Sequence, residues 1–238
     1  MTGVPRNPVV LALASAGLGC SVVVASGETV LGAESDTAMH GQAEKLLPMV
    51  DSVMRRAGLP ASALHIIAVT VGPGSFTGIR IGLATARGIA HATGARVIGV
   101  TGFEAVAAGL AGSSPGAGFI LVALESRRED LYVQLFDHER VALEDPTATM
   151  PAALNERLSG IIGAAPLLVA GDAAQRAASN LSQRPDTMVA AGSAPDAAGV
   201  LQAALCRWPL PAQSAKPVPL YLRPPDVTYS KRGRRVGR

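Results

Sequence analysis

Aromatic residues are scarce in this chain, because Phe, Trp and Tyr together make up only 3% of its 238 residues. Proteins that bind single-stranded nucleic acid on their own stack the bases on aromatic side chains. So few rings argue against an autonomous RNA-binding module. Cysteine is scarce as well, and Cys20 and Cys206 are too few and too far apart to form a disulfide framework. We therefore expect two buried thiols in a reducing compartment.

Long apolar runs are also missing, and the start MTGVPRNP lacks the cationic region and cleavage site of a signal peptide. We therefore expect a soluble, cytoplasmic protein. The net charge of +3 comes from the segment KRGRRVGR at 231–238, which holds five of the 21 basic residues and leaves sixteen against 18 acidic ones. This basic tail either touches RNA phosphates or is a solvated terminus.

Metal-ligand and nucleophile patterns are absent too. The four histidines, at positions 40, 65, 91 and 138, show neither HExxH nor HxxxH spacing. No Ser/His/Asp or Cys/His set can be assembled, because the histidines lie in unrelated local contexts and neither cysteine has an activating neighbour. The sequence therefore predicts no catalytic residue and no metal site.

The most informative stretch that is present is VGPGSFTGIR at 71–80, which follows an apolar strand pattern and precedes a helical one. Gly72 and Gly74 permit backbone angles closed to other residues, with a proline between them to fix the turn. Ser75 or Thr77 can cap the helix. The loop is neither a Walker loop nor a dinucleotide fingerprint, because the third glycine falls one residue late and no lysine follows it. It is either an anion cradle or a purely structural turn.

The first half of the chain predicts the order βββαβαβ, with an antiparallel meander followed by crossover units. The expected elements are strands at 9–16, 20–27 and 28–35, a helix at 40–58 bent at Pro48, a strand at 65–71, a helix at 76–93 and a strand at 95–102.

A second, smaller domain is expected after the linker candidate SSPGAG at 113–118. Its charged residues at 125–130 read as a solvated hairpin tip, and the segment PLYLRP is expected to pack Leu220, Tyr221 and Leu222 against a domain. The other expected elements are a helix opened by Pro151, a strand that turns into a helix at Gly171-Asp172, and a closing helix PDAAGVLQAALCRW. The predicted boundaries are 1–110, 111–222 and a basic tail at 223–238.

The segment GPGSFTGIRIGLATARGIA, together with HGQAEKLLPMV and the late PLYLRP, resembles the TsaB (YeaZ) family. The similarity is strong over 60–105, fair over 9–58 and weak over 110–210. It implies an α/β, actin-like (ribonuclease H-like) fold with two half-domains, in a degenerate member of the ATPase superfamily that includes actin and sugar kinases.

The same resemblance implies that the protein works through the surfaces by which it binds a partner and not through a catalytic site. It implies an accessory subunit, inactive alone, that binds TsaD, the subunit that transfers a threonylcarbamoyl group to the adenosine beside certain tRNA anticodons. The resemblance also implies that the ATPase TsaE joins a larger complex and that tRNA is bound indirectly, through this complex. A homodimer is a further possibility. The alternatives are a metallopeptidase-like or kinase-like enzyme and a self-associating nucleotide-binding module.

The first strand departs from the family pattern. Relatives carry a carboxylate near its end that holds the metal beside the phosphates, whereas this chain has Ala14, which cannot coordinate magnesium. This departure argues against ATP hydrolysis. No cofactor is required on this reading, although ATP or ADP at the complex interface stays open. The possible nucleotide contacts are Ser15, Gly17, Gly171 and Asp172, and a lone Asp at that junction is more often a helix N-cap.

Small residues recur every four positions in the second helix, at Gly78, Gly82, Ala86 and Ala90. Such a stripe lets another backbone approach closely, either that of a partner or that of the chain itself. Family relatives pair with TsaD, or with themselves, through the two N-terminal helices, and a polar stripe of Arg80, Arg87 and His91 would rim such an interface. The predicted interface residues are His40, Leu47, Val50, Met54, Gly78, Ile79, Gly82, Leu83, Ala86 and Ala90.

Overall fold

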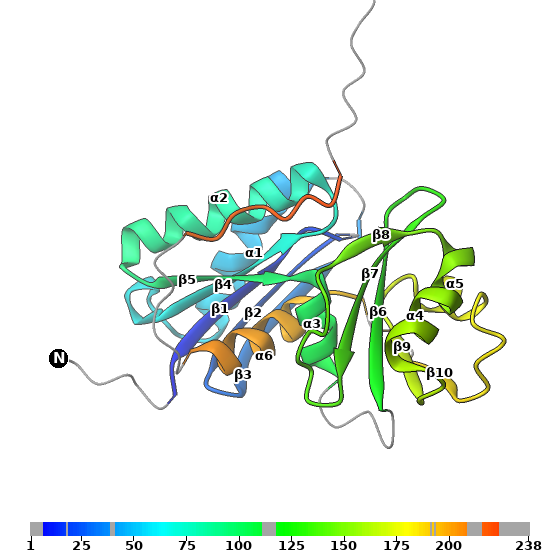
Figure 1. Cartoon of the computed structure of the whole chain (residues 1–238). Coiled ribbons are helices and arrows are strands. Elements are labelled where there is room, and N and C mark those ends of the chain that lie inside the picture. Colours follow the sequence, from blue (N-terminus) through cyan, green and yellow to red (C-terminus); the bar gives the residue numbers. More distant parts are fainter. Residues whose placement is uncertain are drawn as a thin grey trace, which may run out of the picture.

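The computed structural model describes residues 7–17, 19–38, 41–110, 118–190, 192, 194–208 and 216–223. His40 and the basic residues at 231–238 lie outside these ranges. The described chain forms two five-stranded sheets that lie side by side, with helices packed on both faces of each sheet (Figure 1). None of the described helices is long and apolar enough to cross a bilayer.

The first half confirms the predicted order of elements and adds one helix at its end. β1, β2 and β3 pair antiparallel, and β4 and β5 extend the sheet in parallel with β1, which gives the order β3-β2-β1-β4-β5. The elements are β1 (Val9–Ala14), β2 (Cys20–Ser26), β3 (Thr29–Asp36), α1 (Gln42–Arg56), η1 (Ala61–Ala63), β4 (Ile66–Gly72), α2 (Phe76–Thr93), β5 (Arg96–Thr101) and α3 (Gly102–Gly109).

The second half repeats this topology, although no repeat is visible in the sequence. Its sheet has the order β8-β7-β6-β9-β10, again with three antiparallel strands followed by two parallel ones. Each half therefore follows the order βββαβαβα. The elements are β6 (Phe119–Glu125), β7 (Leu131–Asp137), β8 (Thr147–Thr149), η2 (Pro151–Ala153), α4 (Leu154–Ile162), β9 (Leu167–Ala170), α5 (Ala174–Ala178), β10 (Thr187–Val189) and α6 (Ala197–Arg207).

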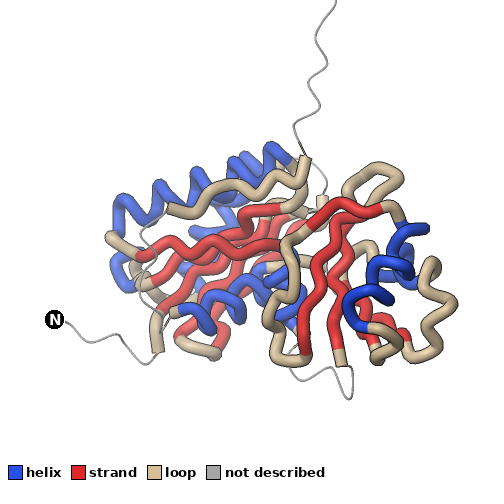
Figure 2. The backbone as a smooth tube through the Cα atoms, in the orientation of Figure 1, coloured by secondary structure: helices blue, strands red, loops and turns tan. Residues whose placement is uncertain are grey.

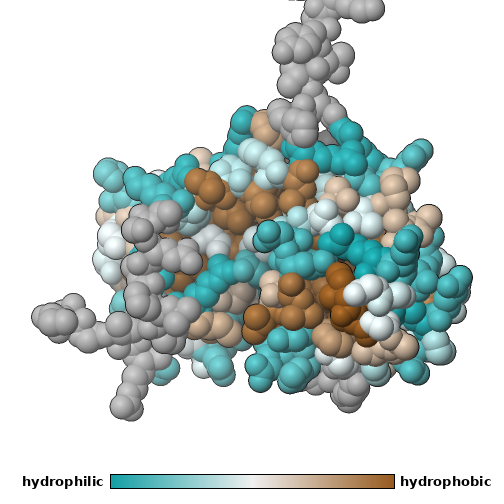
Figure 3. All heavy atoms as spheres, viewed as in Figure 1, coloured by the Kyte–Doolittle hydropathy of each residue, from teal (hydrophilic) through white to brown (hydrophobic). Residues whose placement is uncertain are grey.

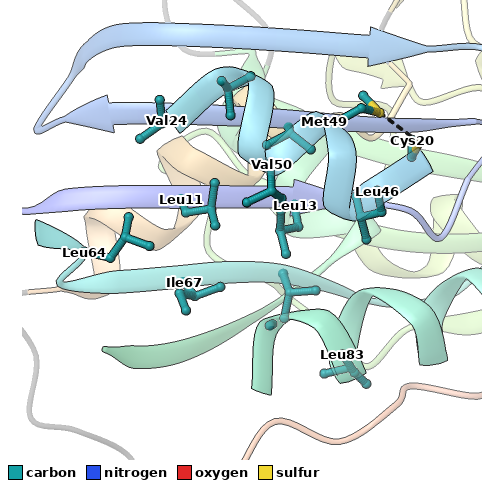
Figure 4. Close-up of a cluster of buried hydrophobic side chains, with 14 of the residues drawn as sticks. Leu11, Leu13, Cys20, Val24, Leu46, Met49, Val50, Leu64, Ile67 and Leu83 are labelled. Atoms are coloured by element: carbon teal, nitrogen blue, oxygen red, sulfur yellow. Dashed lines mark hydrogen bonds between the residues drawn. The ribbon is translucent and has the colours of Figure 1, made fainter. Parts of the chain in front are cut away.

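The first sheet is buried on both faces, which explains why its central strands read as continuous apolar runs. Side chains alternate along a strand, so Leu11 and Leu13 of β1 face α1 and α2, whereas Val10 and Ala12 face α6. Figure 4 shows the first of these two cores, with Met49 and Val50 of α1 lying over β2 and β1. Cys20 is buried there with its Sγ 3.5 Å from Met49 Sδ.

Burial raises the pKa of the Cys20 thiol, which keeps the side chain in its unreactive form. Cys206 is exposed on α6, contrary to the expectation that both thiols are buried. A surface helix has a solvent-facing side as well as a buried one, and Cys206 lies on the solvent-facing side of α6. The amino-acid composition does not show on which side a cysteine falls.

The third helix of each half packs on the sheet of the other half. Val200 and Leu201 of α6 enter the core of the first sheet, and Phe103 and Val106 of α3 enter the core of the second. The two helices also pack on each other at the junction of the sheets (Figure 1). The helix that was predicted to close the second domain thus packs in the first core, and the domain boundary at 111–222 stays a prediction. An amphipathic pattern predicts a buried face but does not say which sheet covers it.

The segment 216–223 also returns to the first half, where it lies along α2 (Figure 2). The Leu220 N–H donates a hydrogen bond of 2.7 Å to the carbonyl of Val71. Leu220 packs on the core of the first sheet and Leu222 on that of the second. Packing of this segment was predicted, and the structure shows that it touches both halves.

Candidate functional site

A cavity of about 510 Å³ opens between the two halves at the carboxyl ends of β1, β4, β6 and β9. In open α/β sheets this edge is where ligands bind. One wall consists of the β1–β2 turn and the β4–α2 loop, and the opposite wall consists of the β6–β7 turn and the β9–α5 loop. Because of the duplication, the β4–α2 and β9–α5 loops occupy equivalent places in the two halves.

The β4–α2 loop has the geometry that its glycines predict. Gly72 and Gly74 adopt φ angles of 113° and 150°, and a Cβ on Gly74 would lie 2.1 Å from the carbonyl oxygen of Ala16. Only glycine fits there. Ser75 is the N-cap residue of α2, and its Oγ accepts a hydrogen bond of 3.2 Å from the N–H of Gly78. Of the two caps that the sequence offered, Ser75 is the one used.

Backbone groups of this loop are bound to the chain itself. The Ser75 N–H donates to the carbonyl of Ala16 at 2.7 Å, and the Gly78 N–H is taken by the cap. These are two of the groups that would otherwise meet an anion at the start of a helix. The contacts support the structural-turn interpretation of the loop over the anion cradle.

Ser15 is a buried link between β1 and α2, and it does not face the cleft. It is 1% exposed, its N–H donates to Thr70 Oγ1 at 3.2 Å, and its hydroxyl donates to the carbonyl of Gly78 at 2.9 Å. A Cβ on Gly78 would lie 2.0 Å from the Ser15 carbonyl oxygen, and one on Gly82 would lie 2.4 Å from Ser15 Oγ. Gly78 and Gly82 therefore allow α2 to pack closely on the residue that follows the chain's own first strand.

Most members of the predicted interface set are buried within the first half, and their role at an interface stays a prediction. Its members Val50, Met54, Gly78, Ile79, Gly82, Leu83 and Ala86 are buried in the first half, and Ala90 packs partly against the same core. Leu47 is different, because it is 54% exposed on α1. His40 lies outside the described residues.

A second stripe of small residues, on the outer side of α2, was missed. Ala84, Gly88 and Ala92 recur every four residues and are all exposed, and a Cβ on Gly88 would meet nothing within 4 Å. Glycine inside a helix costs about 1 kcal/mol relative to alanine. Internal packing explains that cost at Gly82 but not at Gly88. The signal in the sequence was the period of four, which fits two stripes on opposite sides of this helix, because residues two apart are rotated by about 200°.

The four possible nucleotide contacts fall into two groups. Gly17 and Asp172 line the cavity from opposite walls. Ser15 and Gly171 lie behind the walls, and a Cβ on Gly171 would lie 2.0 Å from the carbonyl oxygen of Ala123. The structure thus brings together one residue from each half.

Asp172 is an exposed carboxylate in the second wall, held by the backbone of the neighbouring strand. Its Oδ1 accepts a hydrogen bond of 2.9 Å from the Glu125 N–H. Burial by the surrounding walls raises the pKa of the Asp172 carboxyl, and the backbone hydrogen bonds and the positive charge of Arg127 oppose the rise. The expectation of a helix N-cap is corrected, because the N-cap of α5 is Ala173 and no side-chain cap is present.

The charged residues at 125–130 form part of the cleft wall, whereas the sequence predicted a solvated hairpin tip. Asp130 is only 3% exposed. Arg176 of α5 orders the turn, because its guanidinium lies 2.5 Å from Glu125 Oε2 and donates to the carbonyls of residues 128, 129 and 130 at 2.7–2.8 Å. An arginine fifty residues away cannot be assigned to this turn from sequence spacing. The turn residues that line the cavity are Ser126, Arg127 and Arg128, with Tyr132 beside them.

The position at which the family resemblance leads us to expect a carboxylate is filled by a buried methyl group. Ala14 ends β1, is 4% exposed, and packs in the core on the α6 side of the sheet. Among the residues that the structure describes, no three His, Cys, Asp or Glu side chains lie close enough to hold a metal ion.

Two α/β halves of identical topology, with a cleft at the carboxyl ends of their parallel strands, define an actin-like protein. An activator of 2-hydroxyisocaproyl-CoA dehydratase from Clostridium difficile has a similar fold, with a TM-score of 0.50, 11% identity, and coverage of 84% of this chain and 94% of that one. At that identity the likeness concerns the fold alone.

Closer relatives identify the family. The TsaD family model, tRNA N6-adenosine threonylcarbamoyltransferase, matches residues 35–159. The Escherichia coli tRNA threonylcarbamoyladenosine biosynthesis protein TsaB is 28% identical over 158 residues, which are 65% of this chain and 68% of that protein. The solved structure of YeaZ from Pseudomonas aeruginosa is 26% identical, with a TM-score of 0.75 over 90% of this chain and all of that one. The chain belongs to the TsaB (YeaZ) family.

Proposed function

We propose that this protein is a non-catalytic subunit that pairs with a TsaD-class transferase and is required for threonylcarbamoyl transfer to tRNA in the cytoplasm. The name of the Escherichia coli relative supports the pathway, and the match to the TsaD family model supports a common origin with the transferase. TsaE is expected to join the larger complex, and tRNA is expected to bind mainly through TsaD.

Ala14 is the observation that carries the non-catalytic part of the proposal. A methyl group cannot hold magnesium or its water where the superfamily places a carboxylate. The cleft carboxylates that remain make structural contacts, because Glu125 pairs with Arg176 at 2.5 Å and Asp172 accepts the Glu125 N–H at 2.9 Å. The geometry thus favours a role carried by surfaces.

The outer faces of α1 and α2 are the surface that we propose for TsaD. Leu47 on α1 is more than half exposed, and the outer stripe of α2, Ala84, Gly88 and Ala92, would let a partner backbone approach closely. Exposed Arg80 and other polar residues of α2 lie around it, as is usual for an interface rim. The same surface is the one that a homodimer would use.

Two leucine substitutions on α2 test this surface. Gly88→Leu places a large side chain in open space, so the protein should stay folded and helix propensity should rise, but complex formation with TsaD should be lost. Gly82→Leu is the matched control on the inner stripe, where the new side chain meets Ser15 and Val69. Overpacking there should destabilise the monomer by about 1–3 kcal/mol.

Size-exclusion chromatography with purified TsaD, alongside urea unfolding of each variant, separates the two effects. Complex formation by Gly88→Leu at wild-type affinity would refute the assignment of the outer stripe to the partner.

A nucleotide in the cleft is the second candidate function, favoured by the pairing of Gly17 and Asp172 across one cavity with Arg127 beside them. ATP or ADP bound there would act as a structural ligand at the complex interface. Equilibrium dialysis of ATP against the isolated protein and against its complex with TsaD tests it. Retention by neither would remove the candidate, and turnover of ATP by the isolated protein would contradict the non-catalytic proposal.

A further inference from the structure

The first part of the segment 216–223, from Pro217 to Tyr221, is bound to the first half. Arg87 of α2 donates a hydrogen bond of 2.6 Å to the carbonyl of Pro217. The Leu220 N–H donates to the end of β4 at 2.7 Å. The ring of Tyr221 lies 4.7 Å from that of Phe76, the first residue of α2. Figure 3 shows apolar surface over this region of α2 and the segment.

The last two described residues of the same segment, Leu222 and Arg223, are bound to the second half. Leu222 packs on the core that α3 forms with the second sheet. Arg223 makes an ion pair with Asp130, at the end of the β6–β7 turn. Asp130 is 3% exposed and also accepts a hydrogen bond of 2.7 Å from Ser126 Oγ. Leu220 and Leu222 therefore enter two different cores.

These contacts lie at the mouth of the cleft. Phe76 belongs to the first wall of the cavity and Ser126 to the second, and the segment joins one to the other through Tyr221 and Arg223. Among the described residues, the packed pair α3 and α6 also joins the two halves. The halves therefore meet at the base of the cleft through two helices and at its mouth through this segment.

We propose that residues 216–223 are a strap that holds the two halves together at the mouth of the cleft and sets its opening. Removal of the Arg223 guanidinium leaves the Asp130 carboxylate buried without its counter-charge, which is strongly unfavourable in a folded protein. Opening the cleft returns that carboxylate to water. The strap also fixes the start of α2, so its state couples the cleft to the outer face of that helix.

The distance between the halves tests the strap directly. Spin labels placed at Ala84→Cys on α2 and Gln175→Cys on α5, in a Cys206→Ser background, report the distance between exposed sites of the two halves. Arg223→Gln removes the ion pair, and Leu222→Ala removes the apolar contact without a change of charge. Arg55→Gln is the matched control, because it removes an ion pair with Asp51 inside α1.

Pulsed electron resonance should show one narrow distance distribution for the wild type and for Arg55→Gln. Both strap variants should add a longer and broader population, and amide exchange should rise at Leu220 and in the β6–β7 turn. Distributions identical to the wild type in both strap variants would overturn the proposal, whether or not the strap had detached. The measurement needs no partner protein, so its outcome is independent of the proposed function.

Discussion

Gly82 and Gly88 lie six residues apart on the same helix and have opposite environments. The Cβ of a residue at 82 would collide with Ser15, whereas one at 88 would meet only solvent. The sequence revealed that small residues recur along this helix, but a period of four does not distinguish the inner stripe from the outer one. Only the position of β1 beneath α2 makes that distinction, and this position depends on contacts between residues more than sixty apart in the chain.

Asp172 is a cleft residue whose ionisation affects stability in a defined direction. Its pKa is higher in the folded protein than in the unfolded chain, because the cleft walls partly desolvate the carboxyl group although the residue as a whole is exposed. Between the two pKa values the folded state binds more protons, so the free energy of unfolding falls as the pH rises through that window. The penalty is complete above the folded pKa.

Asp172→Asn removes this penalty and keeps an oxygen to accept the Glu125 N–H. The variant should unfold at a higher urea concentration than the wild type at pH 7, and the difference should shrink as the pH falls toward 4. Equal urea midpoints at both pH values would show that the carboxylate is not destabilised by its surroundings.

At the scale of elements, the first half was largely predictable because each element has a strong period and a marked end. The helix α3 was missed, although Thr101 and Glu104 form a capping box that the sequence TGFE displays. The short strands β8 and β10 were missed because three residues carry no period. The sequence did not show on which sheet α6 packs, because its apolar face would fit either sheet.

The C-terminal elements lead to a prediction about the basic tail. The segment KRGRRVGR holds five basic residues and a single apolar side chain, Val236, so we expect deletion of residues 231–238 to leave the melting temperature and TsaD binding unchanged. The loss of five basic residues should at most weaken the association with tRNA, and only at low salt, because salt screens contacts with phosphates. A fall in melting temperature of several degrees would show that the tail contributes to the fold.

For the whole molecule, the duplicated topology of the two halves explains where the cleft lies. Two halves with the same topology meet at the carboxyl ends of their strands, which creates a cavity in the place where this fold class carries its ligands. The chain retains that cavity, while its first strand ends in Ala14 and its cleft carboxylates Glu125 and Asp172 make structural contacts within the second wall. The fold class and family were predictable from local motifs, whereas the strap and the exchange of the third helices depend on contacts between distant segments.

Threonylcarbamoyl transfer to tRNA by purified TsaD, with and without this protein, tests the central claim most directly. The reaction supplies TsaE, ATP and threonylcarbamoyl-adenylate, and modified adenosine is measured by mass spectrometry of digested tRNA. The account predicts modified tRNA when this protein is present, none above background when it is omitted, and no loss when Asp172→Asn replaces the wild type. Equal yields with and without the protein would contradict it.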